Sequence, residues 1–234
     1  MLLKGFKEFI NESESTVTYQ DLKLLLELGV TDDIAKDVYQ LFDQGKLTHD
    51  ELLDYITQVC EKYRIKKWSL NSEGLVDVAG QVDLSNEKLT RLPLKFGKVT
   101  GFFDCHRNQL TTLDGAPNQV SKSFNCSTNQ LTTLEGAPEI VGVDFGCSDN
   151  YLTTLEGSPE VVGGNFVCTR NQLTTLNGAP EVVGEGFYCG HNQLTTLKGS
   201  PKRVGENFSC SYNQLTSLDG IGEVEGTIYS DLNN

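Results

Sequence analysis

Histidine, basic residues and long apolar runs are all scarce in this chain of 234 residues. The three histidines, His49, His106 and His191, are spread widely, and no nucleophile–base spacing or phosphate-binding glycine loop accompanies them. Lysine and arginine total 19 against 32 acidic residues, and this balance argues against a nucleic-acid partner, which needs clustered cations. No apolar run approaches the ~20 residues that span a bilayer, and no signal-peptide pattern is present. We therefore expect a cytoplasmic, non-catalytic protein with neither a nucleic-acid nor a membrane partner.

What the chain has instead is a repeat, the phrase N-Q-L-T-T-L-x-G-A-P, which returns every 21 residues. Two leucine columns follow this interval, Leu110 to Leu215 and Leu113 to Leu218. Three further columns do so as well: Phe103, Phe124, Phe145, Phe166, Phe187 and Phe208; Cys105, Cys126, Cys147, Cys168, Cys189 and Cys210; Asn108, Asn129, Asn150, Asn171, Asn192 and Asn213. A period of this length is typical of a solenoid, in which one repeat is one structural unit and burial occurs between neighbours.

Within one repeat, the stretch Phe103-Asp104-Cys105 alternates, with Phe and Cys on one face and a variable residue on the other. An alternation of period two indicates a half-buried strand. The G-A-P element then turns the chain, and its proline favours an extended polyproline return. We expect the strands of successive coils to stack as one parallel sheet, with a short return on the outer side.

The pattern F-x-C-x-x-N-x-L-x-x-L resembles the leucine-rich repeat, whose core reads L-x-L-x-x-N-x-L, over about Val78 to Leu232. The short return with its proline is most similar to the bacterial effector type of that repeat. The resemblance implies that Asn108 and its equivalents bond backbone groups across neighbouring coils. The unit Val82 to Leu89 has Glu87 at the asparagine position, and we interpret it as a modified terminal repeat.

The cysteine column offers two interpretations. Adjacent strands lie ~4.8 Å apart, so neighbouring thiols would be close enough for a disulfide or a metal site. No C-x-x-C pair supports zinc, and a column of small, reduced, buried side chains is the simpler interpretation. A stretch similar to half of an EF-hand, Phe42 to Glu51, would place Phe42 at a ligand position, so calcium is rejected there. We expect no metal and no cofactor.

The first part of the chain lacks the repeat and has helical signals. Thr18 to Leu28 is leucine-dense, Thr48 to Glu51 forms a capping box, and Gly45 is a plausible helix stop. The expected fold class is α+β: a small N-terminal helical bundle, residues 1–67, caps a parallel-strand leucine-rich-repeat solenoid, residues 68–234, of about seven to eight coils.

The opening stretch Gly5 to Glu12 resembles the first residues of proteins from large tailed bacteriophages. In some of those a prohead protease cuts after an I-x-E motif, which Ile10-Asn11-Glu12 fits. An amphipathic first helix with Phe6, Phe9 and Ile10 on one side explains the residues equally well. If the chain is phage-encoded, its place is the host cytoplasm or the virion.

Residues that vary while the repeat stays fixed are free of the folding constraint, and they fall on the exposed strand face. Stacked strands would bring them into one concave sheet, which solenoids commonly use for binding. Tyrosine and arginine are the types that most often anchor interfaces. The candidate protein-binding residues are Phe102, Asp104, His106, Arg107, Arg170, Tyr188, His191, Tyr212 and Tyr229. The alternative is a merely solvated sheet with chance aromatics.

Two functions follow. The first is a non-catalytic protein–protein interaction module, encoded by a phage, that binds a host protein through the concave face as an inhibitor or adaptor. The second is a structural or internal head component of a virion. The last unit, Val224 to Asn234, keeps a strand without a polar cap, so self-association through this end would serve the second role.

Overall fold

The computed structural model describes residues 35–233. The chain divides into two compact units, Met1–Val59 and Cys60–Asn234, and each is described by itself. The predicted helical signal at 18–28 and the leader-like residues 5–12 lie outside the described residues. Within the described part, no helix is both long and apolar enough to cross a bilayer.

Two helices are described before the repeats, α3 (Ala35–Asp43) and α4 (His49–Lys62). Gly45 follows α3 at a φ of +67°, a conformation that ends helices and favours glycine. The predicted capping box opens α4: the Thr48 hydroxyl accepts the Glu51 N–H at 3.2 Å, and the Glu51 carboxylate accepts the Thr48 N–H at 2.9 Å. The sequence signals for these two helix ends are confirmed.

One face of α4 is buried, and its residues follow the helical repeat. Leu52, Tyr55, Ile56 and Val59 all have 0% exposure, and they stand at positions i, i+3, i+4 and i+7 of the helix. Apolar burial on one face, rather than helix propensity, supplies most of the stability of a helix this short.

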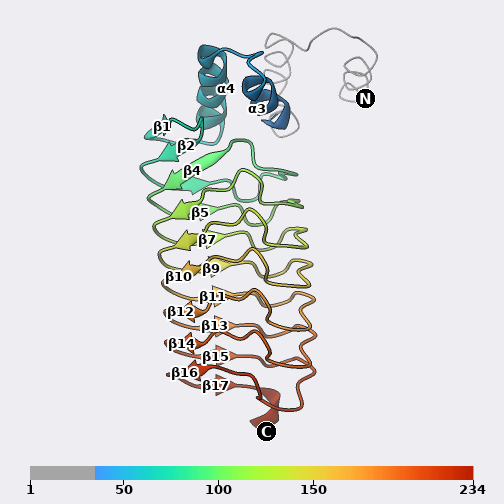
Figure 1. Cartoon of the computed structure of the whole chain (residues 1–234). Coiled ribbons are helices and arrows are strands. Elements are labelled where there is room, and N and C mark those ends of the chain that lie inside the picture. Colours follow the sequence, from blue (N-terminus) through green and yellow to red (C-terminus); the bar gives the residue numbers. More distant parts are fainter. Residues whose placement is uncertain (1–34, 234) are drawn as a thin grey trace, which may run out of the picture. The chain divides into compact units, whose positions relative to one another are not determined.

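The repeats form a β-solenoid of about seven turns, in which each coil contributes one short strand to each of two parallel sheets (Figure 1). Sheet A begins with β1 (Trp68–Leu70), which pairs antiparallel with β2 (Val76–Val78). Its other strands are β4 (Phe96–Val99), β6 (Gln119–Val120), β8 (Ile140–Val141), β10 (Val161–Val162), β12 (Val182–Val183), β14 (Arg203–Val204) and β16 (Glu223–Val224). Sheet B holds β3 (Val82–Asp83), β5 (Phe103–Asp104), β7 (Phe124–Asn125), β9 (Phe145–Gly146), β11 (Phe166–Val167), β13 (Phe187–Tyr188), β15 (Phe208–Ser209) and β17 (Ile228–Tyr229), and η1 (Asp231–Asn233) follows.

Sheet A corrects one expectation. The sequence predicted a single parallel sheet with a polyproline return, whereas the return arm also pairs from coil to coil. The reason is the valine that ends each of these strands: Val120, Val141 and Val183 have 0% exposure, and the residue before each valine points outward. This alternation of period two is the strand pattern, with only two residues to reveal it.

The core between the two sheets consists of columns that run along the stack. The predicted inward orientation of phenylalanine and cysteine is confirmed, because both columns are almost completely buried. Successive phenylalanine rings from Phe103 to Phe208 stack with centroids 5.2–5.6 Å apart. Both leucine columns are equally buried from Leu110 to Leu197. Each coil therefore completes the core of its neighbours.

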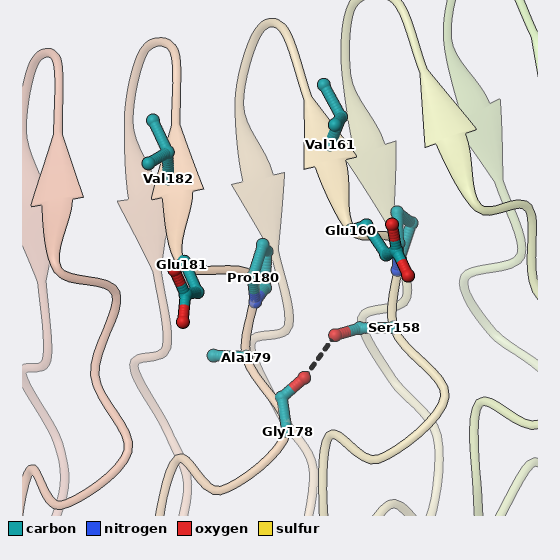
Figure 2. A pocket seen from close by; sticks show the side chains of 9 residues that line it. Ser158, Glu160, Val161, Gly178, Ala179, Pro180, Glu181 and Val182 are labelled. Atoms are coloured by element: carbon teal, nitrogen blue, oxygen red, sulfur yellow. Dashed lines mark hydrogen bonds between the residues drawn. The ribbon is translucent and has the colours of Figure 1, made fainter.

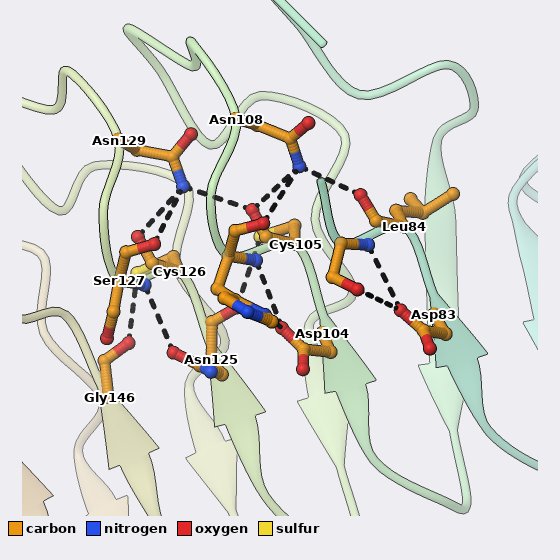
Figure 3. Close-up of polar contacts among 12 residues, drawn as sticks. Asp83, Leu84, Asp104, Cys105, Asn108, Asn125, Cys126, Ser127, Asn129 and Gly146 are labelled. Carbon is orange, nitrogen blue, oxygen red and sulfur yellow. Dashed lines mark hydrogen bonds and ion pairs between the residues drawn. The ribbon is translucent and has the colours of Figure 1, made fainter. Parts of the chain in front are cut away.

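The asparagine column ties each coil to the one before it, as the resemblance implied. The Asn129 amide donates to the Cys126 carbonyl in its own coil and to the Cys105 carbonyl in the preceding coil, both at 3.0 Å (Figure 3). Its Oδ1 accepts the Leu110 N–H at 2.9 Å. Asn108 repeats the arrangement one coil earlier. One buried side chain thus satisfies several backbone groups that the turn leaves without ladder partners.

The turn that follows the second leucine of each repeat requires glycine, and in five of the six coils concerned a proline comes two residues later. The six glycines of this turn have φ between +85° and +93°, which L-residues with a Cβ rarely adopt: Gly115, Gly136, Gly157, Gly178, Gly199 and Gly220. An added Cβ on Gly178 would lie 2.3 Å from the backbone nitrogen of Glu156 in the preceding coil. The repeated glycine is therefore set by backbone conformation and by the close approach of coils.

Candidate protein-binding surface

Two exposed columns carry the residues that vary from coil to coil. We name the outward positions of sheet B the strand column: Asp83, Asp104, Asn125, Gly146, Val167, Tyr188, Ser209 and Tyr229. Three residues later in each coil comes the turn column: Arg107, Thr128, Asp149, Arg170, His191 and Tyr212. From Asp104 to Ser209, each strand-column residue is flanked by a buried phenylalanine and a buried cysteine. Each turn-column residue precedes the repeated asparagine, which is buried from Asn108 to Asn192 and half-buried at Asn213.

Every residue of the turn column has a left-handed backbone, with φ between +54° and +59°. Glycine or asparagine is the usual choice there, because a Cβ in this region costs about 1–2 kcal/mol. This column contains neither residue type, although asparagine stands at the equivalent position Asn86, with a φ of 59°. Six coils therefore place exposed side chains of five kinds at one left-handed position. Aspartate and histidine tolerate this backbone better than most residues, so the strain is concentrated at Arg107, Thr128, Arg170 and Tyr212.

Replacing Thr128 by asparagine is expected to stabilise the chain by about 1 kcal/mol, or a few degrees in Tm. Threonine is β-branched and is the least suited of the six residues to a φ of 58°. Asparagine tolerates this conformation and keeps a side chain, so the unfolded chain gains little entropy. Thermal unfolding followed by circular dichroism measures the effect. A lower Tm in the variant would show that Thr128 stabilises the fold and is not retained at a cost in stability.

The first group of predicted site residues lies around β5. The Asp104 carboxylate accepts the backbone N–H of His106 at 3.0 Å and lies 2.8 Å from its Nδ1, and both side chains are partly buried. Phe102 is half-buried, and Arg107 is exposed on the turn column. Asp104 and His106 therefore hold each other, which leaves Arg107 as the most accessible member of this group.

The second group lies at the other end of the stack. The rings of His191 and Tyr212 stack with centroids 4.2 Å apart and an interplanar angle of 11°, and Tyr212 is 66% exposed. Arg170 stands one coil before His191 and lies 4.0 Å from the Asp149 carboxylate, an exposed pair that contributes little to stability. Tyr188 is half-buried. Its ring lies against Gly186 in the same coil, where an added Cβ would be 2.5 Å from the ring.

The structure thus brings together Arg170, His191 and Tyr212 on consecutive coils, with Tyr188 on the neighbouring strand column. It does not bring Asp104 and His106 to them. Arg107, which belongs to the same coil as these two residues, lies three coils before Arg170, or ~14 Å at the spacing of adjacent strands. Tyr229 is 51% exposed on the last strand of sheet B. Leu215 and Leu218, in the last coil, are only half-buried, and self-association through this end stays a prediction.

The buried thiols do not offer nucleophilic chemistry. Burial raises the pKa of the column from Cys105 to Cys189 well above its usual range, and that of Cys210 to about 11, with the nearby Asp231 charge as a second cause. A thiol that stays protonated is a poor nucleophile and a poor metal ligand. Among the described residues, no group of three or more histidines, cysteines or carboxylates could hold a metal ion. The predicted site residues expose aromatic, cationic and polar side chains instead.

Sequence reasoning missed one surface feature. The outward positions of sheet A include Ile140, Val161 and Val182, whose exposed fractions are 41–52%. The E-I-V and E-V-V triplets contained the signal, but interpreting the return as polyproline hid their alternation. Comparison with known proteins adds no further assignment: no protein-family model matches the chain, and no curated protein is significantly similar to it in sequence.

Proposed function

We propose that the solenoid is a non-catalytic protein-binding module, and that its partner contacts the turn column and the adjacent strand column around Arg170, Tyr188, His191 and Tyr212. The observation that carries the proposal is the turn column itself. At one left-handed backbone position the chain places six exposed side chains of five kinds, while the residue that follows is asparagine in every one of these coils. Selection for folding alone favours asparagine or glycine at such a position.

The composition of this surface fits a protein partner. Tyrosine and arginine dominate the energetics of many interfaces, because each buries a large area and also offers polar atoms. The stacked His191 and Tyr212 rings present aromatic surface that is already ordered, which lowers the entropy lost on binding. The lattice of backbone bonds beneath them fixes their spacing from coil to coil.

We propose further that the repeat is a short form of the leucine-rich repeat. The buried asparagine that bonds backbone groups of two coils supports this, as do the two leucine columns. The second sheet, built from the return arm, is a feature of this chain's own 21-residue unit. Phage origin, a host protein as partner and a role in the virion depend on residues 5–12 and on the last coil, and these stay predictions.

The test is a double variant in which His191 and Tyr212 are both replaced by asparagine. This change removes the stacked rings and relieves the backbone strain, so the variant is expected to be at least as stable as the parent yet to lose its partner. Affinity capture from host lysate with quantitative mass spectrometry measures the loss, expected to exceed tenfold for a partner held by these two anchors.

The matched control is Thr128→Asn, which makes the same type of change in the same column three coils before His191. It should leave capture unchanged. Equal capture by all three proteins would move the interface away from His191 and Tyr212. Loss of capture in the control as well would mean that the strained backbone, and not the side chains, determines binding.

A further inference from the structure

Sheet A presents an exposed apolar column in its middle strands. Ile140, Val161 and Val182 are 41%, 52% and 48% exposed, and they stand on the neighbouring strands β8, β10 and β12. Each is followed by a buried valine, so the three point away from the core. β-branched residues of adjacent parallel strands at this register form a continuous apolar strip.

Folding does not require apolar residues at these positions. The equivalent outward residues are Lys98 and Gln119 on one side of the strip and Arg203 and Glu223 on the other, as the strand registers show. Those strands form the same parallel pairs with polar side chains. The apolar character is therefore confined to three coils in the middle of the sheet, and it calls for an explanation other than sheet formation.

A groove accompanies the strip. It has a volume of about 580 Å³, and its walls come from two successive coils: Ser158, Glu160 and Val161 from one, and Pro180, Glu181 and Val182 from the next (Figure 2). The Ser158 hydroxyl donates to the Gly178 carbonyl and joins two of the turns that line the groove. Side chains of a peptide could lie in it along the surface of the two coils.

Carboxylates border the strip on one side. Glu139, Glu160 and Glu181 each precede an apolar-column residue, and all three are exposed. Only Glu181 has a cationic neighbour among the described residues, Lys202 at 2.6 Å. Glu139 and Glu160 are left next to each other on adjacent coils, where like charges repel. A cation from outside would relieve that repulsion.

We propose that this groove is a second interface, which binds a peptide segment of a protein partner that carries lysine or arginine beside valine-like residues. The apolar column receives the aliphatic side chains and the carboxylates receive the cations. The net charge of −13 attracts such a segment once it comes within about 10 Å, the distance beyond which salt screens charges. The site lies on sheet A, apart from the turn column, and does not depend on the function proposed above.

The test titrates the full chain into a short fluorescein-labelled peptide of alternating lysine and valine, with the fluorescence anisotropy of the peptide as the readout. Peptides of alternating lysine and glycine, and of glutamate and valine, separate the charge from the apolar contribution. The lysine–valine peptide should bind, and both others should bind at least about tenfold more weakly. Binding should weaken as salt is added.

The double variant Val161→Gln with Val182→Gln tests the apolar column, because Gln119 already occupies the equivalent position in β6 and the fold should tolerate it. It should weaken binding about tenfold or more, and Glu160→Gln should weaken it about threefold, mainly at low salt. Lys98→Gln in the same sheet, and the double asparagine variant of His191 and Tyr212, should have no effect.

Three results would overturn the proposal: no binding of the lysine–valine peptide, equal binding of the glutamate–valine peptide, or unchanged binding by the double glutamine variant. Sedimentation of the unliganded chain adds a fourth. A dimer that the double glutamine variant abolishes would identify a second copy, and not a basic peptide, as the occupant of the groove.

Discussion

Replacing Asn129 by aspartate is expected to destabilise the solenoid by about 3 kcal/mol or more. The amide donates at 3.0 Å to the carbonyls of Cys105 and Cys126, and the side chain is only 7% exposed. Aspartate has the same shape but no donor, so a carboxylate oxygen would face two carbonyl oxygens. Buried acceptors that lose their donor cost about 1–3 kcal/mol each, and the buried charge adds to the loss.

Asn125→Asp is the matched control, since it makes the same chemical change four residues away. The Asn125 Oδ1 accepts the Ser127 N–H at 3.1 Å, and Asp104 accepts from its own i+2 N–H in the equivalent place. An aspartate can therefore replace Asn125 at a cost below about 1 kcal/mol, which comes from its neighbour Asp104 on the adjacent strand. Urea unfolding at pH 7 measures both variants. Similar stabilities for the two would show that the buried amide does not hold the coils together.

The buried cysteines, the column together with Cys60 in α4, are expected to make the chain sensitive to alkali, with cooperative unfolding between about pH 9 and 11. Burial raises the pKa of all seven cysteines: Cys60 reaches about 12, Cys210 about 11, and the five from Cys105 to Cys189 lie well above the usual range. In the unfolded chain the same thiols ionise near pH ~8.5.

The direction of this pH effect follows from the number of protons that the folded and unfolded chains bind. Above about pH 8.5 the unfolded chain has released its thiol protons and the folded chain retains them, so the free energy of unfolding falls as pH rises. Each thiol contributes roughly 1 kcal/mol per pH unit, and seven together amount to a loss on the order of the whole stability of a domain. The contribution of Cys210 stops growing above about pH 11, where the folded thiol also ionises.

Urea midpoints measured from pH 8 to pH 11 give the number of protons released on unfolding. The Cys126→Ala and Cys168→Ala double variant should release about two fewer, because it lacks two buried thiols and shares every other titrating group with the parent. If the free energy of unfolding had the same pH dependence in this variant, or did not change up to pH 11, the expected effect of the buried thiols would be contradicted.

Much of the fold could be predicted because the repeat supplies six copies of each observation. A single phenylalanine such as Phe145 says little about its orientation, but a column that recurs at one interval beside alternating variable residues indicates an inward face. The asparagine bonds could be predicted from a resemblance alone, since nothing in Asn129 itself shows which carbonyls it reaches. The helix ends around Gly45 and Thr48 were predictable because capping chemistry is local.

The second sheet and the groove were not predictable in the same way. A two-residue strand such as Val161–Val162 has too few residues for an alternation to stand out, and the proline before it favoured another conformation. The left-handed backbone of the turn column was also hidden, because four of its six residues are of types that usually avoid it. Strain at Thr128 or Tyr212 arises from the coil's closure, which no single repeat's composition reveals.

Thiol labelling of the native chain most directly tests the claim that the repeats hide their constant residues and display their variable ones. A large aromatic disulfide reagent at pH 8 should leave the cysteines from Cys105 to Cys189 unmodified for as long as the chain stays folded, and should modify all of them once urea unfolds it. Rapid modification of these cysteines in the folded chain would place the column at the surface and contradict the account.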